Sequence, residues 1–288
     1  MRSIHRCVFL LAIIFLGFEP AYCESEDGIV LNGVRPLWEA GVGGFAGSLP
    51  DYPAAGQNTF HALALPYLVY RGEFLRVGGE ENRGAVSGRF INNERFELDV
   101  SLSAAFPVDS SNNSARRNMP DLDFLFGIGP QLIIKLVNDP GHRKLDFNLQ
   151  LRSIYSTDFS SINHRGYVFN PKLNYTHEHL TGMDLKLFTS IGPIFATEKL
   201  MDYFYKVDNE YVTPSRRAYD ADAGYLGTNL TLGVSKRFDK QLRLILGTRL
   251  GIHYGATNDD SPLFREKLNL GVFAAFAWSF KQSELPAR

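Results

Sequence analysis

The last third of the sequence contains three consecutive segments in which every second residue is apolar. The apolar residues of the final segment are Leu268, Leu270, Val272, Ala274, Phe276, Trp278 and Phe280. Because successive side chains of a strand point to opposite faces, each such segment has one apolar face and one polar or small-residue face. Segments of more than ten residues are long enough for tilted strands to cross a hydrocarbon layer. The pattern therefore predicts an outer-membrane β-barrel.

The rest of the chain follows the same pattern. It predicts an all-β fold, an antiparallel up-and-down transmembrane β-barrel of about twelve strands, with ten or fourteen as the alternatives. The expected strands are residues 37–47, 60–70, 73–80, 83–92, 94–106, 121–137, 144–156, 165–178, 183–197, 222–238, 241–255 and 265–280. Short turns alternate with long polar links, which is typical of short periplasmic turns and long outer loops. Both termini are then expected on the periplasmic side.

The N-terminus predicts export. Arg2 and Arg6 precede an apolar run at residues 8–18, which is too short for a membrane-spanning helix but suits a secretory signal. We expect residues 1–23 to be the signal peptide. A lipoprotein modified on Cys23 is the alternative.

The remaining chain is expected to have three parts. Residues 24–36 would form a periplasmic segment, 37–280 the barrel and 281–288 a periplasmic tail, in the outer membrane of a Gram-negative bacterium. Both cysteines, Cys7 and Cys23, fall in the predicted leader, so packing and backbone pairing must hold the exported chain together. The net charge of −1 indicates no excess of Lys and Arg for binding nucleic acid, so nucleic acid is excluded as the expected partner.

Charged residues on the predicted strands are expected to face the interior. A Lys or Arg facing the lipid midplane costs about 2–4 kcal/mol, and this cost fixes the register of each strand. The expected interior charges are Glu97, Asp99, Asp146, Arg152, Lys172, Asp184, Lys186, Arg243 and Arg249. Acids and bases are mixed, which favours a charge-balanced filling of a narrow barrel. An ion- or solute-selective lumen is the alternative.

The longest predicted outer loop combines aromatic and basic residues. They are Tyr203, Phe204, Tyr205, Tyr211, Arg216 and Arg217. This composition predicts either part of the interface girdle or a loop folded over the barrel mouth. The alternative is that the arginines bind lipopolysaccharide phosphates. At the other end, Phe238, Trp278 and Phe280 are expected in the periplasmic girdle.

Some polar groups have residue types found in catalytic or metal sites. His177 and His179 share one face of a strand, where they could bind a metal. His253, with Asp259 and Asp260 in the next loop, has the composition of a barrel-rim hydrolase. Oxygen ligands for Ca²⁺ could come from Asp208, Asn209, Glu210, Asp220 and Asp222. None of these groups has the full spacing of a known site, so we expect no catalytic residue, cofactor or metal.

Several stretches resemble one family of outer-membrane proteins. Residues 38–45 (WEAGVGGF) and 50–53 (PDYP) resemble the opening strand and first loop of the MipA/OmpV family, the MltA-interacting proteins. Residues 64–74 (ALPYLVYRGEF) resemble the second strand and turn of that family. Residues 218–224 (AYDADAG) and 260–263 (DSPL) resemble its late outer loop and the approach to its last strand. The resemblance covers nearly the whole mature chain.

The resemblance implies a scaffold rather than an enzyme. Members are similar to a protein that bridges a murein lytic transglycosylase and a bifunctional murein synthase at the outer membrane. We therefore expect a non-catalytic anchor for peptidoglycan-remodelling enzymes, in contact with outer-membrane lipid and lipopolysaccharide. A small-solute channel and a barrel-rim hydrolase acting through His253 are the alternatives.

Overall fold

The computed structural model describes residues 37–71, 75–77, 86–88, 91–139, 143–178, 180, 185–239 and 241–285. The predicted signal peptide (1–23) and periplasmic segment (24–36) lie outside this range. The long strands are β1 (Trp38–Pro50), β2 (Asn58–Arg71), β6 (Phe96–Ala105), β7 (Phe124–Asp139), β8 (Arg143–Thr157), β9 (Ile162–His177), β10 (Leu185–Ala196), β11 (Gly224–Arg237), β12 (Leu242–Ile252) and β13 (Leu268–Gln282). The short elements are β3 (Leu75–Val77), β4 (Val86–Gly88), β5 (Ile91–Asn92), helix α1 (Glu198–Tyr205) and two 3-10 turns (Ser110–Asn112 and Asn209–Tyr211).

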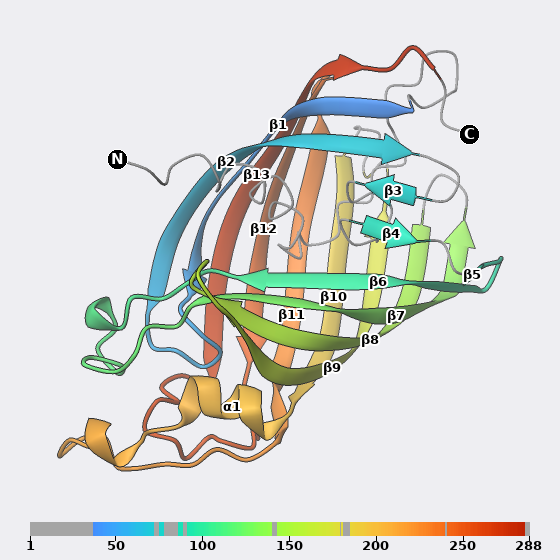
Figure 1. The fold of residues 1–288 in the computed structure, drawn as a ribbon. Helices are drawn as coiled ribbons and strands as arrows, with labels where there is room; N and C mark the ends of the chain where they lie inside the picture. Colours follow the sequence, from blue (N-terminus) through green and yellow to red (C-terminus); the bar gives the residue numbers. More distant parts are fainter. Residues whose placement is uncertain are drawn as a thin grey trace, which may run out of the picture.

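The strands form one antiparallel sheet in the order β4-β3-β2-β1-β13-β12-β11-β10-β9-β8-β7-β6-β5. Apart from β2 and β6, consecutive long strands pair with each other, and β1 also pairs with β13, so the sheet curls strongly (Figure 1). This is the predicted up-and-down antiparallel architecture. The ten long strands match the ten-strand alternative. The strands predicted at 73–80 and 83–92 are represented by the short β3, β4 and β5 among the described residues.

The two faces of the curled sheet differ in polarity. Large apolar side chains are exposed on the outer face, among them Phe60, Leu68, Ile128, Leu151, Phe169, Ile191, Leu232, Leu246, Val272 and Trp278. The buried polar residues include Glu97, Asp99, Ser101, Gln131, Asp146, Asn148, Gln150, Arg152, Asn170, Lys172, Asn174 and Thr176. This inverts the usual arrangement of a soluble protein and is the arrangement of a barrel that has lipid outside.

Glycines allow close packing on the inner wall. A Cβ atom on Gly233 would lie 2.1 Å from the ring of Phe188, and one on Gly247 would lie 2.4 Å from the ring of Phe273. Each aromatic ring therefore lies directly over a glycine of the neighbouring strand. Such contacts bring large side chains flat against a tightly curved sheet.

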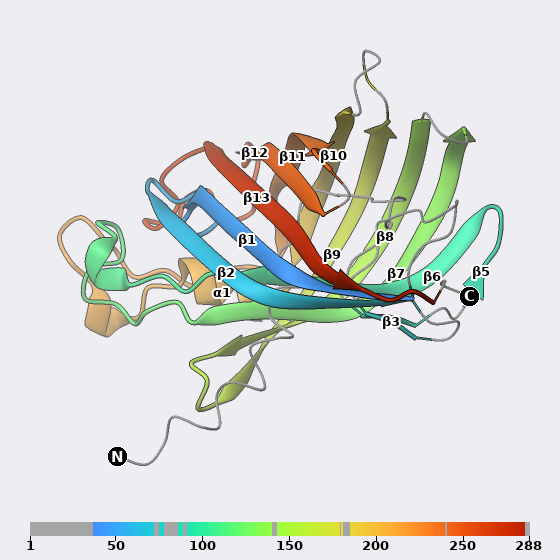
Figure 2. The same cartoon turned by 90° about the horizontal axis from the view of Figure 1, so that it is seen from above.

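Long and short connections lie at opposite ends of the sheet. The long links are residues 51–57, 106–123, 197–223 and 253–267, and Figure 2 shows them with α1 at the end opposite to β3 and β5. At that opposite end, β13 extends to Gln282, past the predicted boundary of 280. Among the described residues, no helix is long and apolar enough to cross a bilayer.

The sheet continues beyond β2 with β3 and β4 and beyond β6 with β5, and β4 contacts β6. Among the described residues, the second ladder of β2 joins Tyr70 and Arg71 to β3. The second ladder of β6 joins Glu97 and Leu98 to β5. The expected closure of the cylinder is therefore not made by a β2–β6 ladder within the described residues.

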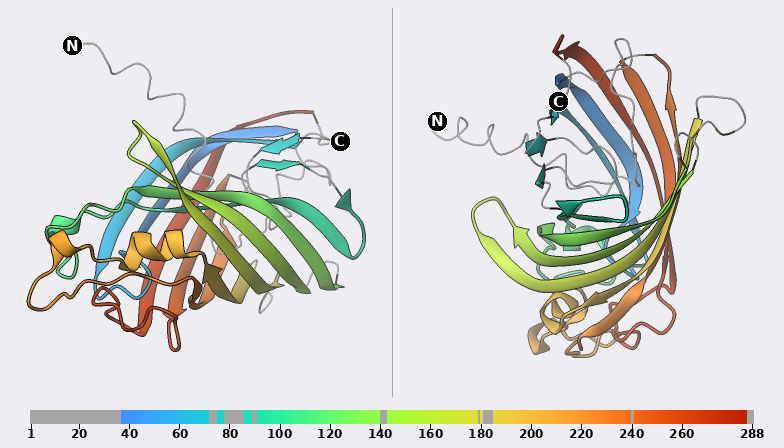
Figure 3. Two further views of the ribbon diagram at one scale, coloured as in Figure 1. Left: turned by 60° about the horizontal axis from the view of Figure 1, so that its bottom comes forward. Right: turned by 90° about the vertical axis from the view of Figure 1, so that its right-hand side faces the viewer.

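At the long-loop end, side chains join β2 and the link before it to the link that follows β6. The rings of His61 and Phe106 stack with their centroids 4.0 Å apart. The Asn113 amide donates to the Asp51 carboxylate over 2.6 Å. The end view in Figure 3 shows the resulting curl, with β1 and β2 facing the strands from β6 to β9.

Candidate functional site

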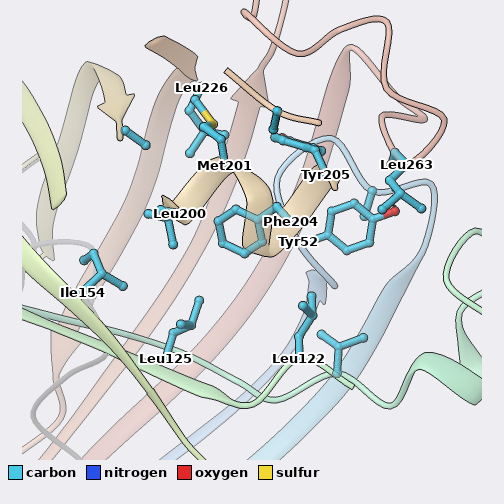
Figure 4. Packing of buried hydrophobic residues seen from close by; sticks show 14 of the residues in the cluster. Tyr52, Leu122, Leu125, Ile154, Leu200, Met201, Phe204, Tyr205, Leu226 and Leu263 are labelled. Atoms are coloured by element: carbon cyan, nitrogen blue, oxygen red, sulfur yellow. Dashed lines mark hydrogen bonds between the residues drawn. The ribbon is translucent and has the colours of Figure 1, made fainter. Parts of the chain in front are cut away.

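The four long links pack together into a structure that we call the loop cap (residues 51–57, 106–123, 197–223 and 253–267). Its apolar cluster also includes inward side chains from the ends of five strands, namely Leu125, Ile154, Val168, Ala196 and Leu226. Figure 4 shows Tyr52, Leu122, Phe204 and Leu263, from the four links, pointing toward one another. The loop cap therefore packs onto the sheet from β7 to β11 at the barrel mouth.

Helix α1 contributes the centre of this cluster. Its buried residues are Leu200, Met201, Phe204 and Tyr205, a spacing that places them on one face of a helix. The Tyr205 hydroxyl donates to the carbonyl of Pro53 over 2.9 Å, and Ser261 donates to the carbonyl of Tyr205 over 2.8 Å. Burial raises the pKa of Tyr205 well above its usual value. This helix is thus fixed to two other links of the cap.

Arg216 acts as an internal connector of the cap. It is buried, and its five N–H groups donate to the carbonyls of Tyr211, Ala115 and Arg117 over 2.8–3.1 Å. A guanidinium has five N–H donors, so none is left for a lipopolysaccharide phosphate. Its contacts join the link 197–223 to the link 106–123.

Arg116 makes a second connection, which the sequence analysis did not identify. Its side chain is buried and donates to the carbonyls of Phe204 and Pro120, both over 3.1 Å, and lies 5.8 Å from the ring centroid of Tyr52. Burial lowers the pKa of the Arg116 guanidinium and raises the pKa of Tyr52 to about 12. Nothing in the local sequence distinguishes Arg116 from its exposed neighbour Arg117, so only tertiary contacts reveal it.

The remaining aromatic and basic residues lie at the cap periphery. Arg217 forms a 2.9 Å ion pair with Asp260, and the Tyr219 hydroxyl donates to the same carboxylate over 2.6 Å. The hydrogen bond from Tyr219 is the main cause that lowers the pKa of Asp260. Tyr203 lies under the Arg165 guanidinium at 4.3 Å, whereas Tyr211 is half-buried beside the cluster. The predicted outer-loop group is thus split between the interior and the surface of the cap.

His253 is held by backbone groups on both sides of its ring. The Ala54 N–H donates to Nε2 over 3.3 Å, and Nδ1 lies 2.9 Å from the carbonyl of Leu226. Because Nε2 accepts, the proton must be on Nδ1, and the ring is neutral. Burial lowers the pKa of His253. Neither ring nitrogen remains to activate a nucleophile in the way that a hydrolase requires.

The described interior charges mostly contact residues of adjacent strands. Glu97 forms a 3.5 Å ion pair with Lys135, which the sequence analysis did not single out, and Arg152 donates to Ser101 over 3.4 Å. Lys186 pairs with Glu178 over 3.2 Å. The other described members are buried or half-buried on β6, β8, β9 and β12, namely Asp99, Asp146, Lys172, Arg243 and Arg249. Asp184 lies outside the described residues.

The other polar groups are also placed. His177 ends β9 with its ring 6.4 Å from that of Tyr175, while His179 lies outside the described residues. Asp208 and Asp220 both pair with Lys206. In the described part of the chain, no group of three or more His, Cys, Asp or Glu residues is arranged to hold a metal ion. Phe238, Trp278 and Phe280 are exposed at the short-turn end.

Solved structures with a similar arrangement are outer-membrane proteins. The NanC porin structure is 8% identical, covers 83% of this chain and 98% of its own, and has a TM-score of 0.36. A Pseudomonas aeruginosa FadL homologue is 9% identical, with coverages of 85% and 90% and a TM-score of 0.32. Outer membrane phospholipase A from Escherichia coli is 11% identical, with coverages of 85% and 94% and a TM-score of 0.32. Scores this low carry no argument about function.

No curated protein sequence matches the chain. A family model described as MltA-interacting protein MipA, in contrast, matches residues 42–280, which is most of the chain. The match spans β1 to β13 and includes both the curled sheet and the loop cap. The chain belongs to the MipA family.

Proposed function

We propose that this protein is a non-catalytic scaffold of the outer membrane that anchors a lytic transglycosylase, and with it a murein synthase, near the peptidoglycan. The observation that carries the proposal is the family match, since the family is described by its interaction with MltA. The apolar outer face supports anchoring in lipid. Contact with lipopolysaccharide would involve Arg217 at the cap surface rather than the internally bonded Arg216.

The barrel mouth supports a scaffold better than a small-solute channel. The loop cap packs as an apolar cluster onto the ends of five strands, and Arg116 and Arg216 bond its links together. Conduction would require water where these side chains pack. We therefore expect the refolded protein to give no stepwise conductance in planar bilayers. Reproducible single-channel steps would favour the channel instead.

We place the partner site at the short-turn end, which would face the periplasm together with the termini. The turn between β5 and β6 is exposed and well defined there, because the Asn93 side chain accepts from the backbone N–H groups of Arg95 and Phe96 over 2.9 and 2.8 Å. Glu94 and Arg95 project into solvent. Such a preformed turn can bind a partner without a large ordering cost.

Crosslinking in intact envelopes, followed by affinity purification, tests this proposal. The wild-type protein should recover a lytic transglycosylase, and the charge reversals Glu94→Lys and Arg95→Glu together should reduce the yield. Arg117→Glu is the matched control, because Arg117 is exposed at the opposite end. Recovery of no transglycosylase by the wild type would contradict the scaffold. A loss with Arg117→Glu alone would contradict the proposed orientation.

A further inference from the structure

The β8–β9 hairpin is longer than a hydrocarbon layer requires. The outward apolar residues of β8 begin at Leu145 and continue to Leu151, and Tyr155 follows on the same face. At about 3.3 Å per residue and a tilt of about 40°, the stretch from Leu145 to Tyr155 covers about 25 Å of height, which is the thickness of the apolar band of a barrel. The hairpin then continues to its turn. Figure 3 shows the yellow-green end of this hairpin projecting from the sheet, clear of helix α1.

A row of rings marks where the lipid-facing part of the hairpin ends. Ring centroids lie 5.4 Å apart between Phe126 and Tyr155, 5.3 Å apart between Tyr155 and His164, and 5.0 Å apart between His164 and Tyr167. Aromatic side chains of barrels gather at the level of the membrane interface. The hairpin tip (residues 157–162) therefore lies beyond the hydrocarbon layer at the long-loop end.

The hairpin tip exposes two large apolar side chains. Phe159 is 67% exposed and Ile162 is 68% exposed. The ring of Phe124 stacks against that of Phe159 with centroids 6.2 Å apart and leaves most of the Phe159 side chain uncovered. Because the hydrocarbon layer ends at the level of Tyr155, lipid chains do not cover these side chains either.

The turn holds Phe159 in this exposed position. The Asp158 carboxylate accepts from the backbone N–H groups of Ser160 and Ser161 over 3.0 and 2.8 Å, and from both hydroxyls over 2.8 and 3.1 Å. The Thr157 hydroxyl accepts from the Phe159 N–H over 2.9 Å and donates to the Ser161 carbonyl over 2.7 Å. Phe159 itself has a φ of +67°, a conformation that bulky side chains rarely adopt and that is concentrated at binding sites. The hydrogen bonds thus fix a ring that is available for contact.

The charges of the hairpin tip do not suit a phosphate. In residues 155–167 the one Lys or Arg is Arg165, which is the extra residue at a register shift of the β8–β9 ladder. Its Nε donates to the inward hydroxyl of Ser156 over 2.8 Å, and its guanidinium lies over the ring of Tyr203. Hydrogen bonds from the Ser161 and Ser160 N–H groups and hydroxyls hold the pKa of Asp158 well below its usual value, so the tip carries a negative charge.

We propose that the hairpin tip binds the sugar of lipopolysaccharide, with the face of a neutral sugar ring stacked on Phe159. The C–H face of a sugar is apolar and packs on an aromatic ring, while its hydroxyls can donate to Ser160, whose own proton is donated to Asp158. The sugars of lipopolysaccharide occupy the layer directly above the hydrocarbon of the outer leaflet, which is the level of the tip. This site rests on the orientation proposed above, with the long links outside, and adds a ligand to the scaffold role.

Cysteine labelling in intact cells tests the orientation separately from the binding. Both native cysteines precede residue 24, so Arg117→Cys and Glu94→Cys introduce exposed thiols at the long-loop end and the short-turn end. A membrane-impermeant maleimide should label the first variant in intact cells and the second only after the outer membrane is broken. The reverse pattern would overturn both this site and the periplasmic placement of the partner.

Binding is tested with the purified protein in phospholipid nanodiscs. The probe is the deacylated core oligosaccharide of lipopolysaccharide after enzymatic removal of its phosphates, so that it contains neither acyl chains nor anionic phosphate groups. We expect saturation-transfer signals in NMR spectra on the C–H protons of a sugar ring, and none with empty nanodiscs. Binding of the phosphorylated oligosaccharide alone, or of lipid A alone, would overturn recognition of a neutral sugar while leaving the scaffold role intact.

Substitutions at Phe159 sharpen this test. Phe159→Gly removes the ring but keeps the turn, because glycine adopts positive φ readily, and should weaken binding about tenfold. Phe159→Tyr keeps the ring and should retain binding. Phe238→Ala removes a ring that is 57% exposed at the short-turn end and is the matched control, with no expected effect. Heat-modifiable migration on gels confirms that each variant has folded. Unchanged binding by Phe159→Gly, or an equal loss with Phe238→Ala, would overturn the site.

Discussion

Phe188 and Gly233 should be energetically coupled, because the ring of one occupies the space that a side chain on the other would need. Gly233→Ala would place a Cβ atom 2.1 Å from Cζ and 2.5 Å from Cε2 of Phe188. The ring would have to move by about 1.3 Å to restore an ordinary contact of 3.4 Å. Phe188 is only 1% exposed, so its surroundings resist that movement. Overpacking of this kind costs about 1–3 kcal/mol.

The coupling energy between Phe188 and Gly233 follows from the effect of removing the Phe188 ring. Phe188→Ala alone should cost about 3–5 kcal/mol, the usual loss for a buried phenylalanine. In that background, Gly233→Ala should cost much less, since the obstructing ring is gone. The carbonyl of Leu246 would still lie 2.8 Å from the new Cβ atom, so part of the cost remains. We therefore expect a coupling energy of about 1–2 kcal/mol.

The assay is denaturant unfolding of the four proteins in phospholipid vesicles, with the free energy of unfolding obtained by linear extrapolation. Gly44→Ala provides the control, because its added Cβ atom would meet Phe276 rather than Phe188. Phe188→Ala should leave the cost of Gly44→Ala unchanged. If Gly233→Ala cost the same with and without the Phe188 ring, the packing of the inner wall would be wrong as described.

Three further changes test other parts of the molecule. Arg216→Ala removes the donors from three carbonyls and should reduce hydrogen-exchange protection of α1 by at least about 2 kcal/mol, whereas an unchanged exchange rate would contradict its connecting role. Burial lowers the pKa of neutral His253 below 6.5, so the unfolded chain binds its proton first as the pH falls. The stability of the loop cap should then decrease below pH 6.5 by up to about 1.4 kcal/mol per pH unit, which hydrogen exchange of the Ala54 amide would measure. His253→Gln should abolish this pH dependence, and a pH dependence that persists in the variant would point to another group. On the outer face, Leu246→Arg should cost about 2–4 kcal/mol and Leu242→Arg, nearer the strand end, about 0–1 kcal/mol; equal costs would contradict the membrane placement.

The sheet could be predicted from the sequence because its determinants are local. In β8 and β9, the alternation of polar and apolar residues sets the inward and outward faces without reference to any other segment. The turn residues between those strands fix the order of the strands in the sheet. The strands expected at 73–80 and 83–92 fall largely outside the described residues, which in this part of the chain form β3, β4 and β5. The same reasoning gave β2 one lipid-facing side, although its inward residues Leu63 and Leu65 are apolar as well.

The loop cap could not be predicted, because its contacts join distant segments. Arg216 bonds to the carbonyl of Ala115, which is 101 residues away, and Tyr205 bonds to Pro53, which is 152 residues away. A single sequence shows that these residues are aromatic or basic, but not which carbonyl each one meets. The choice between a girdle, a folded loop and a phosphate site for these residues therefore needed coordinates.

The polar contacts of the interior and the contacts of the loop cap stabilise different parts of the barrel. Glu97 with Lys135, Gln131 with Gln150 and Arg152 with Ser101 all join strands within the β6–β8 wall. The His61–Phe106 stack, in contrast, joins β2 to the link that follows β6, and it adjoins the loop cap. The sheet therefore depends on polar contacts within this wall, whereas the loop cap joins segments that are distant in the sequence.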